Sequence, residues 1–384
     1  MMSTKDNIGD TIYTLGLTLG LVGYYFMTTM FRTNYQNFFN TLITFSVILL
    51  LGKMLFFSDV NLRELIIFGI LFLVFVIVFI HTGDKKLLFL LVYIYSSKGV
   101  DLKKILKVYC YTIFICTLVT IVAALIGKIP NLIYFRNGIK RSAYGSIYPT
   151  NFAAHIFYMI LAYVALKNGK LNIFEKLVVP ILAYIIMIKC DARLDGYLLY
   201  MLTIILIFVD FAINIVKRLG NTIIPVFMGM LISLSIIFSY NYNPNTKWGY
   251  LLNSIFNNRL SQGNLAFMRY PVELFGQKIP MQGLGDLSGM YRAYREYFYI
   301  DNSYMQILMI SGVITFIIVI SVYLYTLIDY TNKGYYFLVI ACVFFGISSI
   351  IDEQFLMISY NIFLLSLLAD KKKFMLKVDT EGKS

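Results

Sequence analysis

The chain has 384 residues, of which 59% are hydrophobic and 14% are charged, and its formal net charge is +13. A soluble domain of this size needs far more polar surface. The composition therefore excludes a soluble globular protein and indicates that lipid surrounds most of the chain.

Apolar segments recur from one end of the chain to the other. Crossing a hydrocarbon core of about 30 Å takes about 20 mostly apolar residues in a helix. The first such segment is followed by no small-residue cleavage site, so we interpret it as a retained helix and not as a signal peptide. The fourth is short. We place twelve spans, at residues 11–31, 38–57, 65–81, 86–97, 107–127, 150–167, 173–190, 195–213, 222–240, 302–326, 334–350 and 355–369.

These spans predict an all-α fold, a polytopic transmembrane helical bundle that forms one membrane domain over residues 1–384. Orientation follows from Lys and Arg in the short connections, because cytoplasmic connections carry an excess of both. With the N-terminus inside, most of these residues fall on the inner side. Both termini are therefore predicted to be cytoplasmic.

Residues 241–301 form the large extracytoplasmic loop of this prediction. Within it, the segment from Asp286 to Ile300 has the pattern of an amphipathic helix, with Arg292, Arg295 and Tyr299 on one face. A helix of this kind would lie along the outer surface of the membrane.

Arginines predicted on the outer side are the main candidates for chemistry. Arg193 begins a span between Asp191 and Asp195, where a guanidinium costs several kcal/mol unless it faces protein, water or an anion. One interpretation pairs it with a neighbouring aspartate or with lipid headgroups. The other makes it a phosphate ligand, because a guanidinium binds phosphate bidentately and stays charged.

The same two interpretations apply to basic residues elsewhere on the outer side, either as interfacial charges or as parts of one anion site: Arg136, Arg141, Arg269, Arg292 and Arg295. Asp301 precedes Asn302 and Tyr304 at the start of the tenth span, where it is either a helix N-cap or a reactive carboxylate. His155 is either a hydrogen-bonded core residue or a catalyst. Glu353 is interfacial unless it faces a cavity.

Four features together carry a resemblance: Arg193 at the head of a span, the stretch from Arg141 to Asn151, Gly283-x-Gly285 in a late large loop, and Asp301-Asn302-Ser303-Tyr304-Met305-Gln306 entering the next helix. With them, the chain resembles the O-antigen and capsular polysaccharide polymerases, the Wzy-like family, which is related to the O-antigen ligases. It departs from the family at Tyr148-Pro149-Thr150-Asn151, where many members have His-Pro-Asn. The large loop also contains no histidine, which favours a polymerase over a ligase.

The resemblance implies a metal-independent, inverting glycosyltransferase of the GT-C type without a cofactor, at the outer face of the plasma membrane. It would transfer a growing glycan from undecaprenyl pyrophosphate to the sugar of an incoming lipid-linked repeat unit. The implied partners are these lipid-linked glycans, membrane lipids, and a chain-length regulator and flippase of the same pathway, with no nucleic acid.

We therefore hypothesise that Arg193, with Arg141 and either Arg269 or Arg292, holds the pyrophosphate, because preorganised guanidinium groups stabilise the charge of the leaving group. Asp301 is the first candidate for the base that activates the acceptor hydroxyl, followed by Asp195 and Glu353. The remaining candidates for substrate binding are Arg136, Asn151, His155, Arg295, Asn302 and Tyr304.

Three other functions stay open. A transporter, such as a flippase for the same lipids, also fits twelve spans, although two related halves and broken helices are not evident here. A ligase-type transferase would pass the glycan to a different acceptor. A membrane scaffold without catalysis is the third.

Overall fold

The computed structural model of the protein describes residues 4–290 and 297–374, and most of them are helical. The α-helices are α1 (Thr4–Phe26), α2 (Arg32–Phe57), α3 (Leu62–Thr82), α4 (Lys86–Ser96), α5 (Leu102–Leu125), α6 (Pro149–Leu166), α7 (Ile173–Cys190), α8 (Arg193–Ile207), α9 (Val209–Leu219), α10 (Ile223–Tyr240), α11 (Lys247–Ile255), α12 (Arg259–Arg269), α13 (Asp286–Met290), α14 (Ser303–Gln306), α15 (Gly312–Asn332) and α16 (Tyr336–Ser348).

Other elements complete the fold. Strands β1 (Ile133–Arg136) and β2 (Ile139–Ser142) form an antiparallel hairpin, which the all-α prediction did not include. A π-helical turn, Ile307–Ser311, joins α14 to α15. After α16 the chain forms short 3-10 helices at Gln354–Leu356, Ile362–Leu367 and Lys372–Phe374.

Helix ends follow local sequence signals. Asn61 and Glu64 form a capping box at the start of α3, in which each side chain binds the backbone N–H of the other residue. Gly83 ends the same helix in the left-handed conformation, which glycine adopts without strain. Asn172 and Glu175 repeat the capping box at α7.

Six helical segments in the described part of the chain are long and apolar enough to cross a membrane: α2, α3, α5, α6, α10 and the continuous segment Ser303–Asn332. The bent pair of α8 and α9 would make a seventh. On α3 the side chains of Leu65, Ile70, Leu73 and Ile80 are exposed on the surface of the protein. Lipid is the solvent that such surfaces require, so the protein is a membrane protein, as predicted.

Three predicted helices differ from the structure. The span at 195–213 is broken, because α8 ends at Ile207 and α9 continues at an angle of 99° to it. Residues 355–369 form no α-helix. Of the amphipathic helix predicted at 286–300, the described residues Asp286–Met290 are helical, whereas residues 297–300 are not, and Phe298 pairs with Gln282 in a β-bridge. Arg292 and Arg295 lie outside the described residues.

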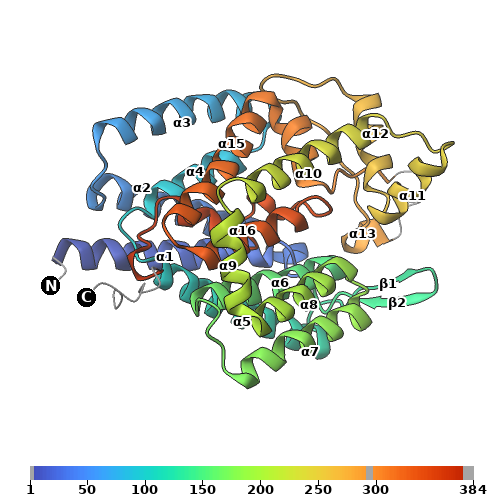
Figure 1. Ribbon diagram of the computed structural model, residues 1–384, viewed down its shortest axis with the longest axis horizontal. Coiled ribbons are helices and arrows are strands. Elements are labelled where there is room, and N and C mark those ends of the chain that lie inside the picture. Colours follow the sequence, from blue (N-terminus) through green and yellow to red (C-terminus); the bar gives the residue numbers. More distant parts are fainter. Residues whose placement is uncertain (1–3, 291–296, 375–384) are drawn as a thin grey trace.

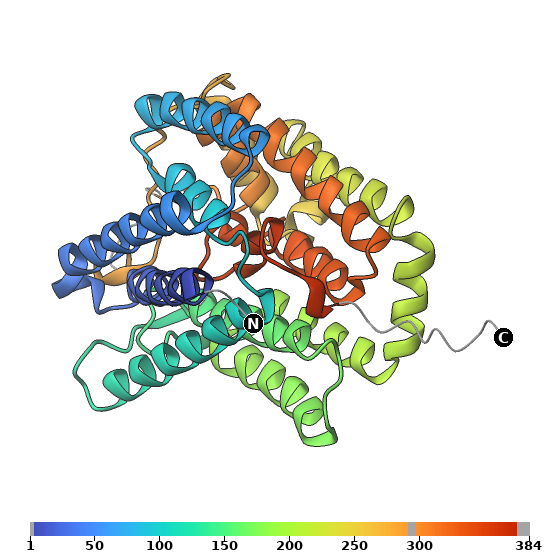
Figure 2. The same ribbon diagram turned by 90° about the vertical axis from the view of Figure 1, so that its left-hand side faces the viewer.

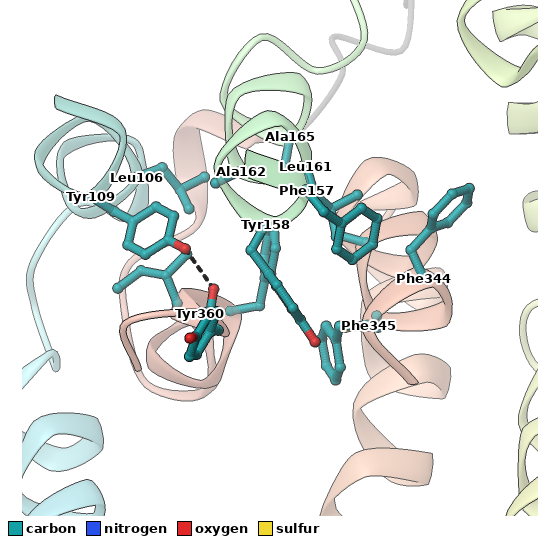
Figure 3. Close-up of a cluster of buried hydrophobic side chains, with 14 of the residues drawn as sticks. Leu106, Tyr109, Phe157, Tyr158, Leu161, Ala162, Ala165, Phe344, Phe345 and Tyr360 are labelled. Atoms are coloured by element: carbon teal, nitrogen blue, oxygen red, sulfur yellow. Dashed lines mark hydrogen bonds between the residues drawn. The ribbon is translucent and has the colours of Figure 1, made fainter. Parts of the chain in front are cut away.

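The chain after α16 is irregular because protein surrounds it. Figure 2 shows this segment, coloured red, among the other helices of the bundle. Tyr109 of α5 donates a hydrogen bond to the Tyr360 carbonyl (2.7 Å), and Ser97 donates one to the Leu365 carbonyl (3.0 Å). Side chains of other elements therefore satisfy carbonyls that an α-helix would bond internally. Figure 3 shows Tyr109 and Tyr360 joined in this way beside Tyr158 of α6.

The connections meet at two opposite ends of the bundle. At one end, which we call the loop end, the β1–β2 hairpin lies with α11 and α12 (Figure 1). There Arg32 forms an ion pair with Asp286, and the Asp286 N–H donates to the Ile147 carbonyl (2.9 Å). At the opposite end Lys98 pairs with Glu64. Connections predicted to be outside are thus joined at the loop end.

Candidate functional site

Asp191, at the C-terminus of α7, joins two of the candidate arginines. Its backbone is left-handed (φ 48°), and its carboxylate accepts hydrogen bonds from Arg136 Nε (2.8 Å) and Arg193 Nε (2.9 Å). Burial opposes ionisation of Asp191, yet these two guanidinium groups hold the pKa of its carboxyl below the ordinary value. The structure therefore contains the ion pair of Arg193 with Asp191 that one of the two interpretations predicts, and the Arg193 side chain is 57% exposed.

Arg141 of β2 reaches Cys190, the last residue of α7, but lies in a different environment. Its side chain extends from β2, its Nε donates to the Cys190 carbonyl (2.9 Å), and its Nη1 donates to the Tyr148 hydroxyl (3.2 Å). The residue is only 2% exposed. Its guanidinium also lies over the Tyr148 ring, 5.2 Å from the centroid.

The charge of Arg141 is left without an acidic partner. Among the residues that the structure describes, no carboxylate lies within ion-pair distance of it, and its buried Nη2 has no hydrogen-bond partner. Buried charges in proteins are normally paired, because an unpaired one costs several kcal/mol. An anion bound at Nη2 would supply both the missing charge and the missing acceptor.

A half-buried ion pair lies between the large loop and the start of α14. Arg259 of α12 forms an ion pair with Asp301 (Nη1 to Oδ2, 2.7 Å), and its Nε donates to the Ile351 carbonyl (2.9 Å). The Tyr297 hydroxyl donates to the same carboxylate (3.1 Å). Burial raises the pKa of Asp301 above its ordinary value, although the charge of Arg259 opposes the shift.

This arrangement corrects the interpretation of Asp301 as a helix cap. The N-cap of α14 is Asn302, whose side-chain oxygen accepts from the N–H groups of Tyr304 (2.9 Å) and Met305 (3.1 Å). Asn302 thus supports the helix, and Asp301 is free to hold Arg259. Arg259 is not among the predicted site residues, because it is one of several basic residues in the large loop and its partner is distant in sequence.

Glu353 faces a cavity of about 190 Å³ at the loop end. Its Oε2 accepts hydrogen bonds from the Tyr299 hydroxyl (2.5 Å) and from Gln306 Nε2 (3.0 Å). Burial, and then the negative charge of Glu353, raise the pKa of Tyr299. We call this space the polar cavity, since its lining includes Thr82, Asp84, Lys86, Tyr299, Gln306 and Glu353.

Electrostatic interactions connect these groups. Tyr148, which accepts a hydrogen bond from Arg141, also interacts electrostatically with Arg259. Asp301 interacts in the same way with Glu353. The network therefore runs from the β-hairpin, past α12, to the polar cavity. Every member of it stands at the loop end of the bundle.

Two predicted site residues lie in the core of the bundle. His155 is fully buried, its Nε2 lies 2.9 Å from the Thr28 hydroxyl, and its ring stacks on Tyr360, as expected of a hydrogen-bonded core histidine. Tyr304 is also buried, and its hydroxyl donates to the Gly346 carbonyl (2.8 Å). Both residues fix the packing of helices beneath the network.

The remaining candidates are spread around the network. Asp195 is buried in the first turn of α8, within the field of Asp352, and its Oδ1 has no partner in the described chain. Asn151 is half-buried in the first turn of α6. Arg269 is exposed and lies over the Phe298 ring, 4.8 Å from its centroid, away from the turn that gathers Arg136, Arg141 and Arg193.

Over residues 4–290 and 297–374, no group of three or more His, Cys, Asp or Glu side chains is arranged to hold a metal ion. No protein-family model, curated protein or solved structure matches the chain. The resemblance to the Wzy-like polymerases therefore stays a prediction.

Proposed function

We propose that the protein is a polysaccharide polymerase that joins undecaprenyl-pyrophosphate-linked oligosaccharide units at the outer face of the plasma membrane. The observation that carries the proposal is Arg141, a buried guanidinium at the loop end with an unbonded Nη2 and no acidic partner in the described chain. The resemblance noted in the sequence supports the choice of reaction.

The proposed topology keeps twelve crossings, with both termini cytoplasmic and the loop end outside, in a GT-C-like bundle. Short or irregular crossings are tolerated where protein shields the backbone from lipid. The segment after α16 meets this condition, because Phe355, Ile358, Tyr360 and Phe363 are all buried. By the same argument the short helices α4 and α16 each cross among other helices.

Arg141 is assigned to the diphosphate of the donor lipid. As the glycosidic bond breaks, its electron pair passes to the diphosphate oxygen, and a preorganised guanidinium in a site without water stabilises that charge. Arg136 and Arg193 share the single carboxylate of Asp191, which leaves one positive charge in excess at this turn. In this proposal they hold the α7–α8 turn in position and attract the anion to it.

Glu353 is assigned to the acceptor. The sequence ranked Asp301 first as the base, but Asp301 is bound by Arg259 and Tyr297, whereas Glu353 faces the polar cavity. By the space that a buried water takes, this cavity has room for on the order of ten waters, the scale of one sugar ring. Glu353 would take the proton of the acceptor hydroxyl. At the same time the oxygen of that hydroxyl would attack the anomeric carbon of the donor sugar, from the face opposite the diphosphate.

The test is reconstitution of the purified protein in liposomes with lipid-linked repeat units, followed by separation of the products by length. Longer lipid-linked chains are expected. Movement of the lipid across the bilayer without elongation would make the protein a flippase, and transfer to an acceptor other than the carrier lipid would make it a ligase. Either result overturns the proposal.

Arg193→Ala tests the sequence-based assignment in the same assay. If Arg193 touches the diphosphate, long-chain product disappears at normal protein levels. If full-length polymer persists, Arg193 is removed from the mechanism and Arg141 keeps the role alone.

A further inference from the structure

A second cavity adjoins the polar cavity. Its volume is about 180 Å³, and we call it the apolar cavity because nearly all its lining is apolar: Tyr24, Met27, Leu90, Tyr93 and Ile358, with Thr28 and Ser359. It lies between the end of α1, α4 and the segment after α16. Along α4 its wall reaches from Lys86 to Tyr93, which is about 10 Å of helix directed from the loop end into the bundle.

Three residues line both cavities: Lys86, Leu356 and Met357. Lys86 is the charged member of this shared wall. Within the described part of the chain its nearest acidic group is Asp84, with 4.0 Å between Nζ and Oδ2, a distance too long for a hydrogen bond. The ammonium group therefore keeps its donors for another partner at the junction of a polar and an apolar space.

We propose that this junction binds an amphiphilic lipid phosphate, with the phosphate at Lys86, the hydrocarbon chain in the apolar cavity and the attached sugar in the polar cavity. The sugar part rests on the proposed function. Because the polar cavity contains Glu353, the lipid bound here is the acceptor, and the donor diphosphate belongs to Arg141.

The chemistry selects this ligand over simpler ones. A free phosphate would use Lys86 but leave the apolar cavity unfilled, and a neutral hydrocarbon would leave the ammonium group without an anion. A chain buried in the apolar cavity gains about 0.8 kcal/mol for each methylene, which inorganic phosphate lacks. The site should therefore prefer farnesyl phosphate to inorganic phosphate.

The first experiment measures binding of radiolabelled farnesyl phosphate to the full-length protein in detergent. Lys86→Met removes the charge and keeps the length of the side chain, and a lost charged hydrogen bond should weaken binding by about tenfold or more. Lys85→Met is the matched control, because Lys85 lines neither cavity and packs over the Phe89 ring. It should bind as the wild type does.

Lys86→Arg keeps the positive charge and should retain binding, which separates loss of the phosphate ligand from loss of the fold. Equal binding by the wild type and Lys86→Met overturns the inference. So does competition by inorganic phosphate at the same concentration as farnesyl phosphate, which would indicate a free-anion site, or equal competition by phosphatidylglycerol, which would indicate a general headgroup site.

The binding assay contains no sugar, so its failure is distinguishable from failure of the proposed function. If the wild type elongates glycans and Lys86→Met binds farnesyl phosphate normally, this inference alone is wrong. If binding depends on Lys86 but the wild type elongates nothing, the lipid phosphate site stands and the polymerase assignment is wrong.

Discussion

Replacing Arg141 by glutamine removes a buried positive charge, and the structure indicates how the fold should respond. Arg141 donates two hydrogen bonds, to the Cys190 carbonyl and the Tyr148 hydroxyl. Each is worth about 1.5–3 kcal/mol when the donor is charged. Against them stands the cost of burying a guanidinium without an acidic partner, which is several kcal/mol. We therefore expect Arg141→Gln to leave the unfolding temperature unchanged or to raise it.

Catalysis should respond in the opposite direction. Removing one preorganised donor from a developing negative charge costs about 10² to 10³ in kcat. The initial rate of chain elongation by Arg141→Gln should therefore fall by at least about 100-fold. The assay is the liposome reaction with lipid-linked repeat units, run beside a thermal unfolding measurement on the same preparation.

Arg269→Gln is the matched control, because Arg269 is an exposed arginine whose contact with the Phe298 ring contributes about 0.5–1 kcal/mol. Both its elongation rate and its unfolding temperature should stay near those of the wild type. Wild-type elongation by Arg141→Gln refutes the assignment. A loss of activity that follows a loss of stability would make Arg141 a structural residue instead.

Three further variants test other parts of the network. Glu353→Gln keeps the hydrogen bonds of the polar cavity but cannot take the proton of the acceptor hydroxyl. The rate of elongation should therefore fall by about 10²-fold or more, while farnesyl phosphate binding is retained. A fully active variant removes Glu353 from the chemistry. Arg259→Met leaves the Asp301 carboxylate without its ion pair, and denaturant titration should show a free energy of unfolding that is lower by about 3 kcal/mol. The double variant Arg259→Met with Asp301→Asn should regain part of this loss, because it no longer leaves a charge unpaired. Equal losses in the single and double variants contradict the pairing. Burial raises the pKa of Asp352 to about 7, so the folded state keeps a proton that the unfolded chain releases at a pH of about 4. The unfolding temperature should therefore fall as the pH rises from about 4 to about 7. Asp352→Asn should flatten this dependence, and an unchanged slope would exclude Asp352 as its source.

The lipid-facing helices could be predicted from sequence because their side chains meet a uniform solvent. On α3 most of the apolar residues are exposed, so the hydropathy of the segment predicts a helix there. The segment at 355–369 is also mostly apolar but lies inside the bundle. There the backbone follows its protein partners, such as Tyr109 and Ser97, and hydropathy says nothing of them.

The candidate site divides in the same way. The pairing of Arg193 with Asp191 could be predicted, because the two residues are neighbours in sequence. The pairing of Arg259 with Asp301 could not, since it requires α12 to fold back against the start of α14. The burial of Arg141 depends on the β-hairpin packing against the end of α7, which no local pattern in the sequence encodes.

The most direct test of this account is an experimental structure of the protein with a prenyl diphosphate bound. We expect a phosphate oxygen within hydrogen-bond distance of Arg141 Nη2, at the atom that has no partner in the described chain. A diphosphate bound at Arg269 or elsewhere on the surface, with Arg141 still unliganded, would contradict the account.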